Sequence, residues 1–237
     1  GKGIVMREPS VVAVDVRNQA VRAVGTEAKE MIGRTPGSIV AVRPLKDGVI
    51  ADFEVTATML KKFIRDALKG SFFSRARVIV SIPSGVTEVE SRAVFDAAHY
   101  AGASEIDLIE EPLAAALGAG LPVFDATGSM VIDIGGGTAE VAVISLGGIV
   151  ANKSIKVAGD DLNADIVEYM GRMHNLRIDE PTAERIKMQV GSALPELEDA
   201  PEDYMVIGPN KVTALPMQVP VSYQEIAHCL EKSIAKI

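Results

Sequence analysis

The sequence of 237 residues lacks the features that define several protein classes. Its one cysteine, Cys229, excludes an internal disulfide framework and suits a reducing cytosol. No run approaches the ~20 consecutive apolar residues of a membrane-spanning helix. Lysine and arginine number 24 against 32 aspartate and glutamate, and the resulting net charge of −8 argues against a nucleic-acid partner, because phosphate backbones select basic surfaces.

Common nucleotide and metal motifs are absent as well. The chain contains neither the Gly-Lys-Ser/Thr of a Walker A loop nor the Gly-x-Gly-x-x-Gly of a Rossmann turn. Its three histidines, His99, His174 and His228, have no metal-ligand spacing, and each falls in or at the end of a predicted helix. Cys229 adjoins Leu230 in a helical pattern, which favours a small buried hydrophobe over a nucleophile.

Strands and helices are predicted to alternate along the chain, and this indicates an α/β fold with helices on the sheet faces. Capping boxes, Thr87 with Glu90 and Ser222 with Glu225, mark two helix starts. We expect strands at residues 4–6, 10–16, 39–42, 49–51, 77–82, 105–109, 148–157, 205–207 and 211–215. We expect helices at residues 26–32, 56–69, 87–100, 112–117, 181–194 and from 222 onward, and one that starts at Asp160 or Asp161.

The remaining stretch, residues 129–145, has apolar β-formers on both sides of three successive glycines, a pattern that predicts a β-hairpin. Three glycines are more than a turn requires, and their backbone N–H groups can approach a phosphate closely. Asp133 before the turn and Thr138 after it are suitable partners for a nucleotide-bound Mg²⁺. The alternative is a glycine-rich hairpin that binds nothing.

Asp-Ile-Gly-Gly-Gly-Thr at residues 133–138, with Glu111-Pro112 before it and Ala-Glu-Arg-Ile-Lys at 183–187 after it, resembles the actin superfamily of actin, heat-shock chaperone ATPases and sugar kinases. Longer stretches are similar to the MreB family of bacterial actin homologues that set rod shape: residues 8–13, 32–36, 47–52, 109–116 and 182–187. The resemblance implies an α/β, actin-like (ribonuclease H-like) two-lobed ATPase fold. Lobe I would cover residues 1–128, with a small subdomain at about 17–52, and lobe II residues 129–237, with a small subdomain at about 160–219.

Carried over residue by residue, the resemblance implies an ATP site between the two lobes. The β- and γ-phosphates would lie on Gly135, Gly136 and Gly137, and Asp133 and Thr138 would serve the Mg²⁺ shell. Glu111 would be the catalytic residue that orients the attacking water.

The ribose and adenine would meet Glu184 and Lys187, which lie three apart on one helix face. The residues alone leave simpler interpretations open. Glu111 could be a first-turn carboxylate favoured by the helix dipole, and Glu184 with Lys187 a surface ion pair.

The family likeness further implies a cytoplasmic protein, peripheral on the inner face of the cell membrane, that polymerises into filaments and directs cell-wall synthesis with partners such as MreC, MreD and RodZ. Phe72 and Phe73 are predicted to form a membrane-inserting loop, because Lys69, Arg75 and Arg77 beside them suit anionic headgroups. The alternative is that both rings fold back onto the core.

The resemblance also implies a chain that lacks segments at both ends. A first phosphate hairpin would precede residue 1, and a second glycine-rich segment for adenosine would follow residue 237. Two other functions therefore stay open: a soluble actin-fold kinase or chaperone-type ATPase, and a non-catalytic fragment.

Overall fold

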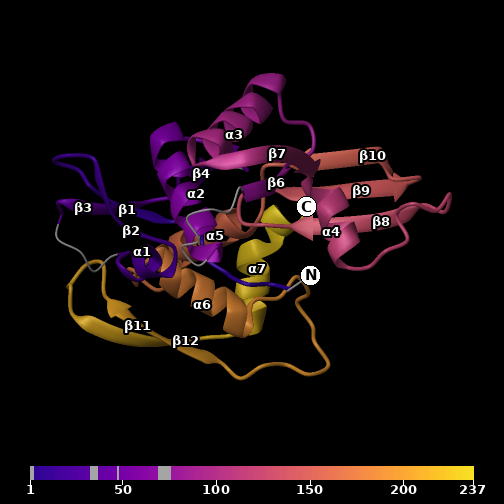
Figure 1. The fold of residues 1–237 in the computed structure, drawn as a ribbon. Coiled ribbons are helices and arrows are strands. Elements are labelled where there is room, and N and C mark those ends of the chain that lie inside the picture. The colour runs from indigo at the N-terminus through magenta and orange to yellow at the C-terminus, as the bar shows by residue number, and fades with distance from the viewer. Residues whose placement is uncertain (1–2, 33–36, 47, 69–75) are drawn as a thin grey trace. The chain divides into compact units, whose positions relative to one another are not determined.

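The computed structural model describes residues 3–32, 37–46, 48–68 and 76–237 (Figure 1). The chain divides into two compact units. The first comprises residues 1–133 and 140–154, and the second residues 134–139 and 155–237, so the chain passes between them within the glycine hairpin. The lobe boundary at residue 128 and the two small subdomains stay predictions.

In the first unit, β1 (Val12–Asp15) lies between β2 (Ala20–Val24) and β3 (Ile39–Val42) and runs antiparallel to both. Alternate β1 residues point to opposite faces. Ala13 packs with Ala28 of α1 (Thr26–Glu30), while Val12 and Val14 pack with Met59 of α2 (Phe53–Ala67). This sheet is therefore buried on both faces, as its continuous apolar run predicts.

Helix α2 begins three residues before the predicted start, because Asp52 caps it by accepting a hydrogen bond from the Val55 N–H at 3.0 Å. Between β3 and α2, the two-residue strands β4 (Leu45–Lys46) and β5 (Val49–Ile50) pair with each other. Strand β5 corresponds to the strand predicted at residues 49–51, whereas β4 was not predicted.

The first unit also contains a parallel pair of strands. Strand β6 (Ala76–Ile82) pairs with β7 (Ala103–Glu110), and the crossover helix α3 (Glu88–Tyr100) connects the two strands. The capping box is confirmed: Thr87 Oγ1 accepts from the Glu90 N–H at 3.2 Å, and Glu90 Oε2 accepts from the Thr87 N–H at 2.7 Å. Helix α4 (Glu111–Gly118) follows β7 directly, with Pro112 in its first turn.

The glycine hairpin forms as predicted. Strands β8 (Ser129–Ile134), β9 (Ala139–Ser145) and β10 (Gly148–Ile155) make one sheet in the order β10-β9-β8 (Figure 1). Ile144 of β9 is fully buried with Ala116 of α4 and Val123. This small cluster packs α4 against the sheet.

The elements of the second unit pack around one apolar core. Helices α5 (Gly159–Met173), α6 (Glu180–Val190) and α7 (Tyr223–Ile234) pack with the antiparallel hairpin of β11 (Tyr204–Pro209) and β12 (Pro216–Val221). The largest fully buried side chains of this core are Ile166, Met170, Leu176, Ile186, Ile226, Val190 and Val206. Ile166 and Met170 of α5 are fully buried in this core, whereas Met173 at the end of the helix is exposed.

Two predicted strands are wrong, and one predicted helix ends earlier than expected. Residues 4–6 are irregular, and β1 pairs with β2, a strand that was not predicted, as well as with β3. Helix α6 ends at Val190, where Gly191 caps it. The strand predicted at 211–215 is instead the hairpin loop, because Asn210 Oδ1 accepts from the N–H groups of Val212 and Thr213 and holds a turn there.

The second predicted capping box is half formed. Ser222 accepts from the Glu225 N–H at 3.2 Å, but the Glu225 carboxylate accepts from the Tyr169 hydroxyl at 3.0 Å and lies 2.5 Å from His174 Nε2. Burial and this hydrogen bond raise the pKa of Tyr169 to about 12. The Glu225 side chain therefore contacts Tyr169 and His174 instead of the backbone N–H of Ser222 that a capping box would require.

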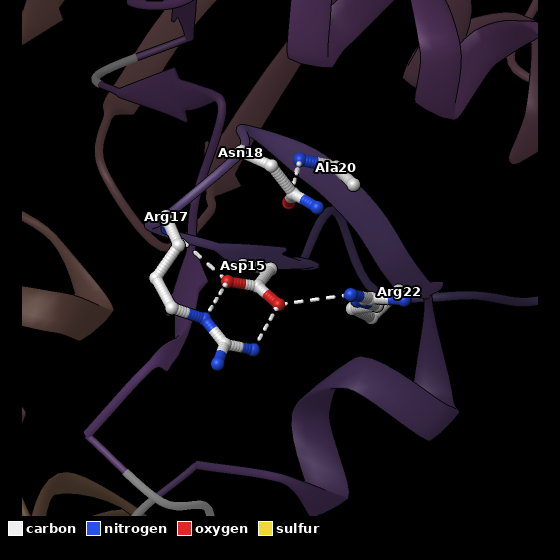
Figure 2. A network of polar contacts seen from close by, with 5 residues as sticks. All are labelled: Asp15, Arg17, Asn18, Ala20 and Arg22. Carbon is white, nitrogen blue, oxygen red and sulfur yellow. Dashed lines mark hydrogen bonds and ion pairs between the residues drawn. The ribbon is translucent and has the colours of Figure 1, made fainter.

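Figure 2 shows a polar network at the end of β1. Asp15, 1% exposed, accepts from Arg17 Nε and Nη2 at 3.0 and 2.8 Å and from Arg22 Nη2 at 2.9 Å. The hydrogen bonds from Arg17 and then Arg22 lower the pKa of Asp15. A lowered carboxyl pKa contributes stability that is complete at neutral pH and declines only as pH falls below the unfolded-state pKa.

Among the described residues, no helix combines the length and the apolar character that crossing a bilayer requires.

Candidate functional site

The turn between β8 and β9 is closed by one hydrogen bond. The Gly135 N–H donates to the Thr138 carbonyl oxygen at 2.9 Å, and Thr138 is buried. This bond uses the first glycine amide of the turn. It leaves the amides of Gly136 and Gly137 as the two groups that a phosphate could take.

Helix α5 fixes the direction of those two amides. The N–H of Gly159 donates to the Gly135 carbonyl oxygen at 3.1 Å, and the N–H of Asp160 donates to the Gly136 carbonyl oxygen at 2.8 Å. In a trans peptide the carbonyl points opposite to the next N–H. The N–H groups of Gly136 and Gly137 therefore point away from α5, and neither donates a hydrogen bond within the part of the chain that the structure describes.

Backbone conformation does not require these glycines, because none of the three has a positive φ. Packing explains one of them: a Cβ on Gly136 would lie 3.2 Å from Asp160 Oδ2. A Cβ on Gly135 would meet only the Thr138 carbonyl oxygen, at an ordinary 3.5 Å. Glycine at position 135 thus leaves open space at the turn, as close approach by an outside group requires.

Helix α6 supports the same corner through Lys187, whose Nζ donates to the Gly159 carbonyl oxygen at 2.9 Å. Lys187 thereby ties α6 to the first residue of α5. This contact was not foreseen from the sequence, which suggested an ion pair with Glu184 as the simple alternative. A Cβ on Gly159 would lie 3.1 Å from the Gly135 carbonyl oxygen, so glycine is needed there for close packing.

In the first unit, Glu111 is the first residue of α4 and is partly buried. Its pKa is raised above the usual glutamate value, mainly by burial and then by the negative charges of Glu140 and Asp133. Carboxylates whose pKa is perturbed in this way are common at functional sites.

Glu140 and Ser84 form a buried polar contact that the sequence did not predict. Glu140 on β9 is 2% exposed, and its Oε1 and Oε2 accept from the Ser84 N–H at 3.0 and 3.3 Å. A glutamate in an otherwise apolar β-strand, two residues after Thr138, is the one signal that could have pointed to it.

The structure thus divides the predicted residues between the units. Gly135, Gly136, Gly137, Thr138, Glu184 and Lys187 lie in the second unit, whereas Glu111 and Asp133 lie in the first. Phe72 and Phe73 fall outside the described residues. Within the described ranges, no group of three or more histidine, cysteine, aspartate or glutamate side chains could hold a metal by itself.

The raised pKa of Glu111 predicts a stability effect. The folded state holds the proton to higher pH than the unfolded state, so ionising Glu111 destabilises the fold as pH rises through the raised pKa. Glu111→Gln should therefore raise the free energy of unfolding at pH 7, and the gain should vanish at low pH, where Glu111 is protonated in both states. Urea denaturation across pH measures this.

The matched control is Glu54→Gln, which removes an exposed carboxylate from the first turn of α2. It should give no gain, since that charge favours the helix dipole. Equal effects of the two substitutions at pH 7 would contradict the assignment.

The family model described as MreB/Mbl protein matches residues 1–237 of this chain. Cell shape-determining protein Mbl of Bacillus cereus is 48% identical over 237 residues, which cover all of this chain and 71% of Mbl. Cell shape-determining protein MreB of Escherichia coli is 49% identical over 242 residues, covering all of this chain and 69% of that protein.

Solved structures agree. The crystal structure of Spiroplasma citri MreB5 bound to ADP matches with a TM-score of 0.91 at 37% identity, covering all of this chain and 70% of MreB5. A MamK double helical filament structure, with a TM-score of 0.74 at 17% identity over 97% of this chain and 70% of MamK, shows the fold alone. The predicted actin-like α/β fold is confirmed, and the chain belongs to the MreB/Mbl family of cell shape-determining proteins.

Proposed function

We propose that the protein binds and hydrolyses ATP with Mg²⁺, and that its phosphates bind the N–H groups of Gly136 and Gly137. The observation that carries this proposal is that the N–H groups of Gly136 and Gly137 point away from α5 and donate no hydrogen bond to the described part of the chain. Successive backbone amides of this kind form anion-binding concavities. Crystal structures of MreB5, at 37% and 36% identity, with ADP and with AMPPNP support a nucleotide as the ligand.

Glu111 orients and activates the attacking water in this proposal. Its raised pKa makes the ionised carboxylate a stronger acceptor for a water proton than an ordinary glutamate. Asp133 and Thr138 serve a Mg²⁺ that also binds the phosphates. Because nucleotide-bound Mg²⁺ usually keeps several waters and takes only one or two protein carboxylates, a dedicated protein cage is not required.

Glu184 and Lys187 contact the adenosine moiety in the same proposal. The hydrogen bond from Lys187 Nζ to the Gly159 carbonyl supports a second contribution from Lys187, because it holds α6 against the helix that orients the phosphate amides. The nucleoside and phosphate contacts would then both depend on the packing of α6, the start of α5 and the glycine turn in the second unit.

Membership of a cell shape-determining family supports the larger function. We infer that the protein polymerises into filaments on the inner face of the cell membrane and directs cell-wall synthesis. Proteins such as MreC, MreD and RodZ would be its partners. Phe72 and Phe73 would insert into the membrane.

Gly135→Ala tests the phosphate site. The added Cβ meets only the Thr138 carbonyl at 3.5 Å, so the fold should persist, while the open space at the turn is filled. ADP affinity should fall about tenfold, which corresponds to about 1.4 kcal/mol. Isothermal titration calorimetry with Mg²⁺ and ADP measures the change.

The control is Gly118→Ala, because a Cβ at position 118 meets no atom within 4 Å and Gly118 belongs to α4 of the first unit, not to the glycine turn. It should leave ADP affinity unchanged. Equal affinities for Gly135→Ala and the wild type, with both folded, would reject phosphate binding at this turn.

The membrane proposal is tested with a Phe72→Ser/Phe73→Ser variant. It should lose most co-sedimentation with liposomes that contain anionic lipid, because insertion is driven by burial of the two rings. Phe124→Ser removes a ring that is 72% exposed elsewhere and should sediment like the wild type. Unchanged sedimentation of the double variant would exclude this loop as the membrane anchor.

A further inference from the structure

The β11–β12 hairpin is apolar on both faces. Its inward side chains, Val206, Val219 and Val221, lie in the core of the second unit. The residues between them point the other way and pair in register as Met205 with Pro220, Ile207 with Gln218, and Pro209 with Pro216. An antiparallel sheet with one face on a core usually carries polar side chains on the other.

This outward face is exposed and carries no charge. Met205 is 46% exposed and Ile207 67%. Lys211 is the only charged residue between positions 204 and 221, and it packs over Gly171 of α5, where an added Cβ would lie 3.0 Å from Lys211 Nζ. An exposed apolar patch of this kind is typical of an interaction site.

Prolines limit how a partner can approach the hairpin. Pro216 and Pro220 have no N–H to direct away from β11, so the free edge of β12 lacks donors that an added strand would need. On the other edge, the Arg177 N–H donates to the Pro209 carbonyl oxygen at 3.0 Å and occupies the end of β11. A partner is therefore expected to pack on the face rather than to extend the sheet.

The segment that leads into β11 is strongly acidic. Residues 191–203 contain no lysine or arginine, and their carboxylates are all exposed: Glu196, Glu198, Asp199, Glu202 and Asp203. Leu197 among them packs against the core of the second unit, which holds the segment on the same unit as the hairpin. The last two carboxylates immediately precede β11 and place negative charge at one end of the apolar face.

Charge decides between two kinds of occupant. A second copy packed face to face across a twofold axis would bring two acidic segments together, and the chain as a whole carries a net charge of −8. Like charges disfavour association, whereas opposite charges steer encounter and fix register. The surface therefore suits a partner that combines apolar side chains with lysine or arginine.

We propose that the outward face of β11 and β12, together with the acidic residues 196–203, is a docking surface for a basic segment of another protein. Apolar side chains of that segment cover Met205 and Ile207, and its cations meet the acidic residues. The surface shares no residue with the candidate phosphate site, so docking is a function separate from nucleotide binding.

Fluorescence anisotropy of the full chain with a labelled peptide of alternating leucine and lysine pairs tests the proposal. A peptide with glutamate in place of lysine should bind at least about tenfold more weakly. Met205→Thr/Ile207→Thr keeps strand-forming side chains at position 207 and at position 205, and it should lower affinity for the lysine peptide about tenfold. Met188→Gln, which removes a methionine 74% exposed on α6, is the matched control and should bind like the wild type.

Glu202→Gln/Asp203→Asn tests the charges, and it also serves if the threonine variant fails to fold. Its affinity for the lysine peptide should fall about threefold at low salt, and the difference should shrink in about 0.5 M NaCl because salt screens exposed charges. Equal affinities of the threonine variant and Met188→Gln, or equal binding of the two peptides, would overturn the proposal. Self-association that the threonine variant loses while it still binds the peptide would overturn it too, because the face would then belong to a second copy.

Discussion

Two hydrogen bonds, from the first two amides of α5 to the carbonyls of Gly135 and Gly136, are the constraint on which the candidate phosphate site depends. Since a peptide carbonyl and the following N–H point in opposite directions, these bonds determine where the turn presents its own donors. A helix N-terminus often binds anions directly. Here the first amides of α5 donate to the carbonyls of the turn, so the candidate anion donors are instead the N–H groups of Gly136 and Gly137.

Carboxylates in the first unit show how one chemical group serves two purposes. Asp15 is matched by Arg17 and Arg22, and its lowered pKa makes it a stabilising charge. Glu111 is partly buried near other negative charges, and its raised pKa makes its ionised form a cost to folding. If Glu111 acts as proposed, stability is sacrificed where a reactive carboxylate is useful, a pattern common at functional sites.

Much of the fold could be predicted from local patterns. The glycine hairpin, the Thr87 capping box and the amphipathic helices follow from hydrophobic period and capping chemistry, which act within a few residues. Strand β2 was missed although Ala20 pairs with Asp15 across a short loop, because Arg22 interrupts its brief apolar run. The second strand of the β11–β12 hairpin was placed five residues early because Asn210 organises the intervening loop.

The same distinction holds for the site. The glycines, Asp133, Thr138 and Glu111 could be named from motifs. Gly159 and Ser84 could not, because they act through backbone groups that sequence does not mark, and Lys187 was named for a contact other than the one it makes. Burial of Glu140 depends on how β9 packs, which no neighbouring residue reveals.

The central claim is that the amides of Gly136 and Gly137 receive phosphate. Glycine-selective ¹⁵N labelling, with amide resonances followed by NMR during titration with Mg²⁺ and ADP, tests it most directly. The amide protons of Gly136 and Gly137 should shift downfield on saturation, while that of Gly118 should not move. Saturable ADP binding that leaves both of these amides unshifted would contradict it.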